Sequence, residues 1–205
     1  GLSQEAGIAE HKPIENAGHG HGCGHNLLGA ASLLAATAVK NWIEKNNIKA
    51  RIRYYGCPAE EGGGAKVYMA REGLFDDVDI ALHWHPSSQN AASAAAALAN
   101  ISAKFRFYGI SAHAAGAPEK GRSSVDGVEA MNAMVNMMRE HVPQEARIHY
   151  VITDGGKAPN VVPDFAEVYY YSRHNSRDVV RSIFNRIGKA GEGAALGTGT
   201  TMDYE

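Results

Sequence analysis

The sequence predicts an α/β fold in its first half and a small α+β domain inserted after it. Before Pro86, helical and strand-like hydrophobic patterns alternate with short turns between them, which favours a parallel α/β layer. After Pro86, amphipathic segments follow in the order strand, helix, strand, strand, helix, which indicates a separate α+β unit. We place the first domain at residues 1–97, the inserted domain at 98–192 and a return linker at 193–205.

Hydrophobic spacing defines the elements of the first domain. Residues 1–25 have no helical period and carry glycines alternating with histidine and cysteine, which is typical of a loop. Apolar residues then repeat with helical spacing from Asn26, whose side chain can cap the first turn, until Asn46 and Asn47 end the helix. The expected elements are a helix at 26–45, a strand at 51–56, a helix at 60–71 that stops at Gly73, and a more buried strand at 78–83.

The inserted domain is predicted in the same way. The strong alternation around Phe105 is typical of a strand with one face in water. Valine and methionine residues from Val125 to Met138 form one stripe at helical spacing, which predicts an amphipathic helix. The expected elements are a strand at 101–108, a helix at 123–141, strands at 147–153 and 165–171, and a helix at 177–190, followed by a Gly- and Thr-rich tail.

Composition and charge exclude several functional classes. With 44% hydrophobic residues the chain is not disordered, and its apolar stretches are shorter than the ~18–20 residues that a membrane span needs. A net charge of -2 gives no basic surface for nucleic acid. Two cysteines do not support a disulfide scaffold, and no targeting peptide is visible. We therefore expect a cytoplasmic protein with neither a nucleic acid nor a membrane as partner.

Two clusters contain residues capable of metal chemistry. Cys23 and His25 lie two residues apart in a Gly-rich loop, so a thiolate and an imidazole can reach one cation, although a flexible loop with a buried cysteine explains them equally well. Glu60 and Glu61 lie where a strand is expected to end and a helix to begin. One carboxylate can bind a metal while the other accepts a proton from water. Favourable acidic charge at a helix N-terminus is the simpler explanation for such a pair taken alone.

A third cluster is formed by His83 and His85. Alternation puts both on the same face of the expected strand, at the carboxyl end where α/β sheets bind ligands. Together the three clusters supply a thiol, imidazoles and carboxylates, a set that fits Zn²⁺ or another divalent ion such as Mn²⁺. A rival hypothesis makes Cys23 a nucleophile beside a histidine, as in thiol proteases. It leaves the two glutamates and His85 without a role.

Five motifs in order along nearly the whole chain carry a resemblance to a known family. They are Gly22-Cys-Gly-His-Asn26, Cys57-Pro-Ala-Glu-Glu61-Gly, Asp79-Ile-Ala-Leu-His-Trp-His85-Pro, Gly109-Ile-Ser-Ala-His113-Ala-Ala and Asn160-Val-Val-Pro163. The chain thereby resembles the aminoacylase/carboxypeptidase-type metallopeptidases, often called the M-twenty peptidases, and in particular the amidohydrolase branch that includes p-aminobenzoyl-glutamate hydrolase. The resemblance implies a zinc-peptidase-like catalytic domain, partial here, and an α+β lid that mediates homodimerisation.

The resemblance also implies roles for individual residues. It implies that Cys23, His25, Glu61 and His85 are metal ligands, with His83 as the alternative to His85, and that the complete enzyme holds two divalent ions, zinc or manganese. It implies that Glu60 is the general base and that His113 steadies the oxyanion, commonly in the partner subunit's active site. Asn160 and Arg173 are implied as contacts to a substrate carboxylate, for which an arginine fork is well shaped.

The sequence departs from the family pattern in three respects. Asn26 stands where the branch often has aspartate, which removes one charge near the metals. The family also has a strand upstream of the position of Gly1 and a late histidine ligand, and no histidine follows His174 here. We therefore expect a segment of a longer enzyme, or a chain that a partner stabilises, with an incomplete two-metal site.

The expected function is metal-dependent hydrolysis of an amide bond in N-acyl amino acids, of which p-aminobenzoyl-glutamate is one example, or in dipeptides. Water activated by the metal would attack the carbonyl, with Glu60 as the base. The alternative, from a different class, is a non-catalytic metal-binding or dimerisation piece, or a regulatory subunit that lacks a complete active site.

Overall fold

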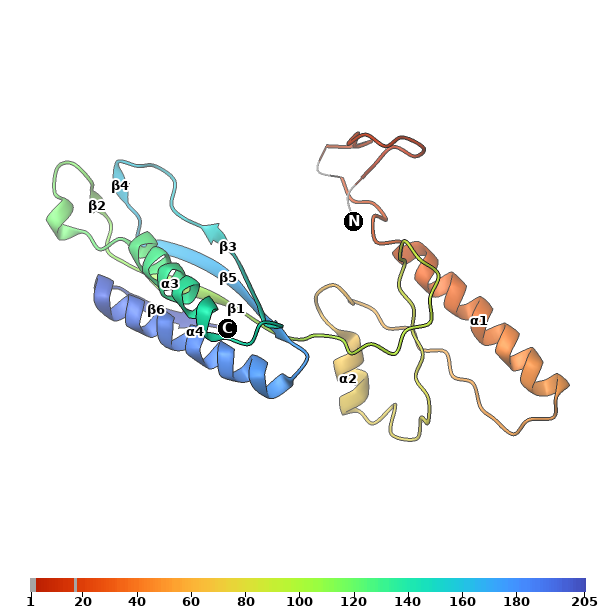
Figure 1. The fold of residues 1–205 in the computed structure, drawn as a ribbon. Coiled ribbons are helices and arrows are strands. Elements are labelled where there is room, and N and C mark those ends of the chain that lie inside the picture. Colours follow the sequence, from red (N-terminus) through yellow and green to blue (C-terminus); the bar gives the residue numbers. More distant parts are fainter. Residues whose placement is uncertain (1–2, 17) are drawn as a thin grey trace. The chain divides into compact units, whose positions relative to one another are not determined.

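The computed structural model describes residues 3–16 and 18–205 (Figure 1). The chain divides into two compact units, Gly1–Ala92 and Ser93–Glu205, and each is described here by itself. Helices and a sheet both contribute, so the prediction of a mixed α/β architecture is confirmed. Among the described residues, no helix combines the length and the apolar character that crossing a membrane requires. The domain boundaries within the full-length protein stay a prediction.

Two helices form the regular structure of the first unit, α1 (His25–Lys45) and α2 (Ala65–Arg71). The expectation that Asn26 caps the first helix is wrong, because the N-cap is Gly24, whose φ of 72° only glycine adopts without strain. Helix α2 begins later than expected. Ala59 (φ 55°) and Gly64 (φ 61°) adopt left-handed backbone conformations, which a right-handed helix does not allow. Residues 60–63 therefore form a turn instead of the first turn of the helix.

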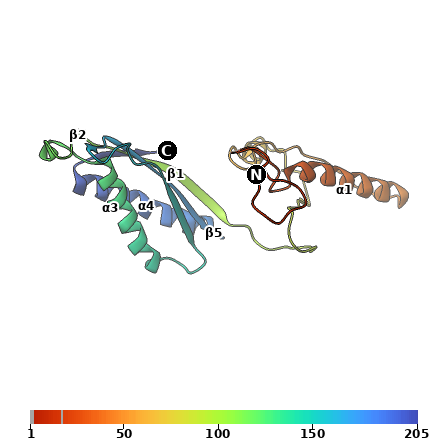
Figure 2. The same cartoon turned by 90° about the horizontal axis from the view of Figure 1, so that it is seen from above.

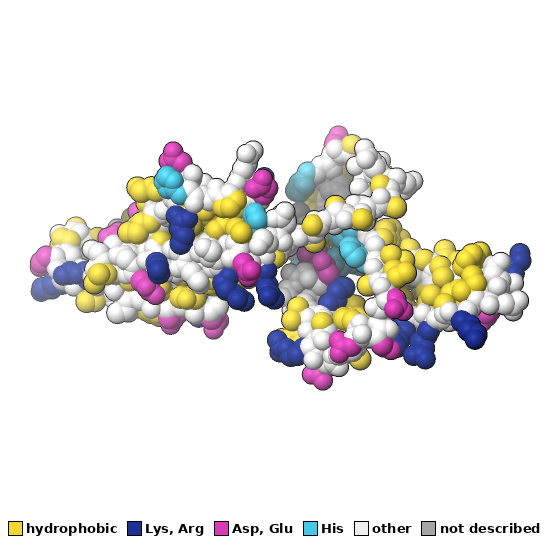
Figure 3. Space-filling model, turned by 60° about the horizontal axis from the view of Figure 1, so that its bottom comes forward, with side chains coloured by type: hydrophobic (Ala, Val, Ile, Leu, Met, Phe, Trp, Pro, Cys, Tyr) yellow, Lys and Arg dark blue, Asp and Glu magenta, His cyan; other side chains and the backbone are white. Residues whose placement is uncertain are grey.

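The two strands expected in the first unit, at 51–56 and 78–83, are not formed in the described residues. A strand needs a neighbour for its backbone hydrogen bonds, and neither segment has one in the part of the chain described here. An ion pair between Arg53 and Asp77 links the first segment to the residue just before the second. Without a neighbouring strand, most of the apolar residues of these segments are exposed, and the side chain of Leu82 is 91% exposed. Figure 3 shows hydrophobic side chains at the surface of this unit.

The second unit contains all five elements predicted for it, together with three short strands that were not predicted. The predicted elements are β1 (Ala99–Tyr108), α3 (Ser124–Met138), β3 (Arg147–Asp154), β5 (Phe165–His174) and α4 (Arg177–Thr198). The additional strands are β2 (Ala112–His113), β4 (Val161–Val162) and β6 (Thr201–Tyr204). Strands of two to four residues carry too little alternation to be recognised in a sequence.

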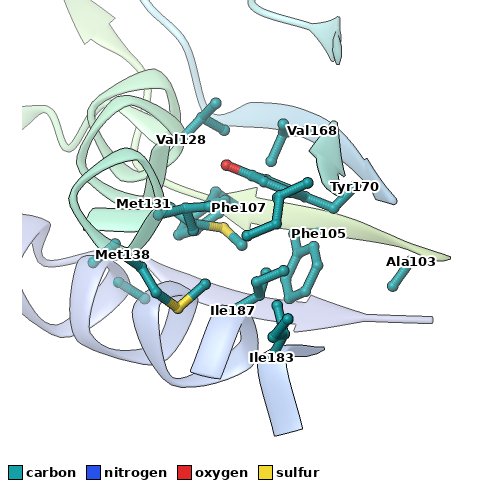
Figure 4. Close-up of a cluster of buried hydrophobic side chains, with 14 of the residues drawn as sticks. Ala103, Phe105, Phe107, Val128, Met131, Met138, Val168, Tyr170, Ile183 and Ile187 are labelled. Carbon is teal, nitrogen blue, oxygen red and sulfur yellow. The ribbon is translucent and has the colours of Figure 1, made fainter. Parts of the chain in front are cut away.

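Four strands form an antiparallel sheet in the order β3-β5-β1-β6, and β2 pairs with β4 in a second, two-stranded sheet. Helices α3 and α4 both cover one face of the larger sheet, and the opposite face is open (Figure 2). Figure 4 shows the core between these layers, where Phe105, Phe107, Met131, Tyr170 and Ile187 are fully buried. Each such side chain contributes roughly 1.5–3 kcal/mol by its removal from water.

The chain after Ala190 differs from the expectation. We expected the last helix to end there, and this is wrong, because α4 continues to Thr198 and stops at Gly199 with a φ of 67°. Gly191 lies inside this helix and packs closely, since a Cβ there would lie 2.9 Å from Met202 Cε. The residues proposed as a return linker therefore form the end of α4 and strand β6, which pairs with β1.

Candidate active site

Three side chains of the first unit converge on one point. One potential ligand atom each of Cys23, His25 and Glu61 lies within 4.8 Å of the other two. His25 Nε2 is 3.1 Å from Glu61 Oε1 and 3.6 Å from Glu60 Oε2. The structure thus brings four of the sequence-predicted site residues together, from the start of α1 and from the turn before α2.

Local backbone geometry produces this convergence. Gly24 separates Cys23 from His25, and its left-handed φ lets the chain turn sharply into α1. Ala59 also has a positive φ, and its carbonyl accepts hydrogen bonds from the backbone N–H groups of Gly62 and Gly64. The resulting tight turn presents both glutamates to His25.

The chemistry of this group fits a divalent ion. His25 Nε2 is buried, yet it has no hydrogen-bond partner, although the Glu61 carboxylate is only 3.1 Å away. The two atoms are therefore close without hydrogen-bond alignment, and an unsatisfied buried nitrogen is costly. Thiolate, imidazole and carboxylate are all zinc ligands, and ligands bound at about 2.0–2.3 Å around a tetrahedral ion lie roughly 3.3–3.8 Å from one another. The three atoms here lie within 4.8 Å of one another, which is a comparable spacing. Three protein ligands would leave a coordination position open.

His85 is not a member of this group, but its loop packs against it. A Cβ on Gly24 would lie 2.9 Å from Pro86 Cγ, so the residue after His85 touches the turn between Cys23 and His25. His85 Nδ1 lies 3.1 Å from the carbonyl oxygen of Pro86. When Nδ1 carries the proton, its N–H donates a hydrogen bond to this carbonyl, and Nε2 is left with a free lone pair, as in metal-ligating histidines.

His83 is the alternative ligand, and its side chain is exposed. Between the two histidines, Trp84 Nε1 donates hydrogen bonds to the carbonyl of Leu28 and to Ser32 Oγ. These bonds tie the segment to α1. The assignment of either histidine as a ligand stays a prediction.

In the second unit, His113 has a defined hydrogen-bonding state. Its Nδ1 accepts from the backbone N–H groups of Ala115 at 3.2 Å and Gly116 at 3.0 Å. In the neutral imidazole the proton must then be on Nε2, which makes that atom a donor. Asn160 lies beside it, because its carbonyl accepts from Ala114 N and because His113 pairs with Val161 across β2 and β4.

Arg173 lies elsewhere in the second unit. It is near the end of β5, over the Tyr171 ring at 5.2 Å, and its buried Nε has no hydrogen-bond partner. Val162 leads into the other end of that strand, at Phe165. At ~3.4 Å per residue, about 27 Å of strand separates Phe165 from Arg173. The structure therefore brings His113 and Asn160 together and does not bring Arg173 to them within one chain.

Glu167 lies on the open sheet face, near the start of β5. Thr153 Oγ1 donates to its carboxylate at 2.7 Å, Arg106 Nε donates at 3.0 Å, and Lys104 Nζ lies 3.1 Å away. Burial raises the pKa of this carboxyl, but the three donors outweigh burial and hold its pKa below the ordinary value. Arg106 is further paired with Glu205 at 2.7 Å.

Sequence reasoning did not single out Arg147. In the register of the sheet it lies directly opposite Arg173. The alternation of residues 147–153 indicated which of them share a face, but only the pairing of β3 with β5 shows which residue faces which.

Comparison with known proteins identifies the family. Residues 88–193, about half of the chain, match the family model of the peptidase dimerisation domain of the M-twenty peptidases. The chain belongs to the M-twenty peptidase family. This confirms the resemblance inferred from the five motifs. The match to a dimerisation domain also agrees with the α+β fold that the second unit of this M-twenty chain adopts.

The relatives include enzymes that hydrolyse amide bonds, as their names state. One subunit of the p-aminobenzoyl-glutamate hydrolase from Escherichia coli is 50% identical over 99% of this chain and 42% of its own length. The Xaa-Arg dipeptidase of Mus musculus is 31% identical over 91% of this chain and 43% of its own length. The M-twenty chain thus spans less than half the length of these curated relatives.

A solved structure supports the fold. A protein described as an aminohydrolase from methicillin resistant Staphylococcus aureus superposes with a TM-score of 0.69 and 20% identity. The match covers 100% of this chain and 56% of that one. At this identity the likeness establishes the fold of the M-twenty chain and nothing about its substrate.

Proposed function

We propose that the full-length protein is a metal-dependent amidohydrolase that cleaves the amide bond of N-acyl amino acids, such as p-aminobenzoyl-glutamate, or of dipeptides. The observation that carries the proposal is the convergence of Cys23, His25 and Glu61, with Glu60 beside them. The names of the relatives from Escherichia coli and Mus musculus support the amide bond as the target. Both cysteines are free thiols, which supports a reducing compartment, and we propose the cytoplasm.

Cys23, His25 and Glu61 would hold a divalent ion, zinc or manganese, with His85 as a further ligand and a second ion in the complete enzyme. A bound ion of this kind supplies a Lewis acid that polarises the scissile carbonyl and lowers the pKa of water. Glu60 would accept the proton of the attacking water and later deliver it to the leaving amine. The proximity of Glu60 to His25, at 3.6 Å, supports this role.

His113 would stabilise the negative charge that develops on the carbonyl oxygen. Its Nε2–H is free to donate because two backbone N–H groups occupy Nδ1. Asn160 and Arg173 would bind the carboxylate of the substrate. Because about 27 Å of strand separates the two ends of β5, one small substrate cannot contact Arg173 and His113 of the same chain. The two residues would then belong to different subunits of a homodimer.

The edge strand β3 is the proposed dimer contact. Its middle residues Tyr150, Val151 and Ile152 are apolar and at least 37% exposed, and its outer backbone edge has no partner in the described part of the chain. The opposite edge, β6, is short and carries Asp203 and Glu205 beside it, as protected edges do. The uncharged, apolar stretch in the middle of this eight-residue edge favours pairing with a second copy.

The deciding experiment replaces the proposed base. Glu60→Gln in the full-length protein should abolish hydrolysis of p-aminobenzoyl-glutamate while metal content, measured by atomic emission, stays near that of the wild type. Glu72→Gln, an exposed change at the end of α2, is the matched control and should keep its activity. Retained turnover in Glu60→Gln would rule out the assignment of the base.

A second candidate function is supported by one observation. The relatives include two different subunits of the Escherichia coli hydrolase, one 50% identical to this chain and the other 26% identical. The full-length chain would then be one component of a heteromeric enzyme, regulatory or catalytically incomplete by itself. Amidase assays separate the two candidate functions. The purified chain is assayed alone, and then together with a protein from the same source that resembles the subunit of 26% identity. Full activity of the chain alone would exclude this candidate.

A further inference from the structure

Two arginines face each other on the open side of the sheet. Arg147 of β3 lies directly opposite Arg173 of β5 in the register. Their neighbours Ile148 and Ser172 are also opposite one another and are buried beneath the helices. Because side chains alternate between the faces of a sheet, Arg147 and Arg173 share the uncovered face.

Like charges directly opposite each other destabilise a sheet unless something neutralises them. The other two cations of this face are neutralised within the chain, since Lys104 and Arg106 are paired with Glu167, and Arg106 also with Glu205. By contrast, no carboxylate oxygen in residues 3–16 and 18–205 lies within 4.0 Å of a side-chain nitrogen of Arg147 or Arg173. The arginine pair is therefore a site of unbalanced positive charge.

Both guanidinium groups have N–H donors that make no hydrogen bond within the described residues. Arg173 Nε is buried and makes no hydrogen bond, while the Tyr171 ring supports the guanidinium at 5.2 Å. Arg147 uses Nη1 for the carbonyls of Gln144 and Ala146, both at 2.7 Å. The Nε and Nη2 groups of Arg147 are left for a ligand, because a guanidinium carries five N–H donors.

We propose that this arginine pair selects substrates whose leaving amino acid has two carboxylates, so that the substrate class is N-acyl glutamate or N-acyl aspartate. Arg173 binds the α-carboxylate, as in the proposed function on which this inference rests, and Arg147 binds the side-chain carboxylate. Opposite residues on neighbouring strands have Cβ atoms about 4.5–5.5 Å apart, so two carboxylates of one amino acid can reach both guanidinium groups. Each carboxylate then has the bidentate partner that its planar shape favours.

The test compares two substrates that differ only in this second carboxylate. The full-length protein is assayed with p-aminobenzoyl-glutamate and p-aminobenzoyl-glutamine, and the ratio of their kcat/KM values is the readout. Arg147→Gln should lower this ratio about 10- to 100-fold, the loss expected for one charge-assisted hydrogen-bonded contact. Arg147→Lys, which keeps the charge without the fork, should recover part of it.

The ratio is independent of how much of a preparation is folded, because both substrates report on the same molecules. Arg181→Gln is the matched control, since Arg181 is an exposed residue on α4, which covers the other face of the sheet. Equal ratios for Arg147→Gln and the wild type would overturn the selection by Arg147. If the wild type hydrolyses neither substrate nor any other N-acyl amino acid, the proposed function itself fails.

Discussion

Gly127 of α3 lies directly against the ring of Phe107 on β1, where a Cβ would come within 2.4 Å of Phe107 Cδ1. Alanine is a better helix former than glycine by about 1 kcal/mol, but Phe107 is fully buried and has no room to move. Overpacking of this kind costs about 1–3 kcal/mol. We expect Gly127→Ala to destabilise the full-length protein, as measured by chemical denaturation.

Gly193 of α4 provides the control for this prediction. A Cβ at this exposed position meets nothing closer than Met134 Sδ at 3.9 Å. The helix propensity then acts alone, and Gly193→Ala should stabilise by up to about 1 kcal/mol. Equal effects of the two substitutions would contradict the packing of α3 on β1.

The thiol of Cys23 should be needed for metal binding. Cys23→Ser replaces a thiolate ligand with a hydroxyl that stays protonated at neutral pH, so the metal content of the full-length protein should fall well below that of the wild type. The control is Cys57→Ser, because Cys57 Sγ lies 3.7 Å from the carbonyl of Tyr55 and is not a member of the ligand group. The same loss of metal in both variants would point to a general effect of cysteine removal.

His113 should act on kcat more than on KM. Removal of one oxyanion donor typically costs about 10²–10³ in kcat, so His113→Gln should lose activity on that scale. The control is His141→Gln, which alters an exposed histidine of the same unit.

The proposed homodimer predicts that inactive variants complement each other. Random exchange between His113→Gln and Glu60→Gln dimers should restore about a quarter of the wild-type activity if the two residues of one active site come from different subunits. Absence of recovery after verified subunit exchange would place both residues in one chain.

The apolar edge of β3 should control the oligomeric state. Val151→Lys puts a charge into an exposed position of this edge, which disfavours edge pairing. Sedimentation velocity should show a shift from dimer toward monomer. Arg181→Lys keeps the charge and lies on α4, so that variant should sediment like the wild type. A dimer unchanged by Val151→Lys would move the interface away from β3.

Glu167 should make stability depend on acid pH. Its folded-state pKa is held below the ordinary value of about 4.3, so its stabilising contribution is complete above that pH and is lost as the pH falls through the folded-state pKa. Glu167→Gln should therefore lower the free energy of unfolding near neutral pH, by about 1–2 kcal/mol for the lost charged hydrogen bonds. The difference from the wild type should shrink below about pH 4. A difference independent of pH would assign the effect to packing.

The five long elements of the second unit were predictable because each one has its own hydrophobic pattern. The stripe around Met131 and the alternation around Phe105 come from burial against each other, and that burial is complete within this chain. The strands expected at 51–56 and 78–83 do not form, because these segments have no neighbouring strand in the described part of the chain. An apolar, alternating segment becomes a strand only when a neighbour accepts its backbone hydrogen bonds.

For the candidate site, the sequence by itself determined which residue types were available: a thiol, imidazoles and paired carboxylates in motifs of one family. It could not show that Ala59 and Gly24 adopt left-handed conformations, which let Glu61 meet His25. Nor could it show that Arg147 faces Arg173 or that β5 separates Arg173 from His113. Spacing along a chain fixes side-chain direction only within one element. The approach of residues from different elements depends on turns and strand register, which tertiary packing decides.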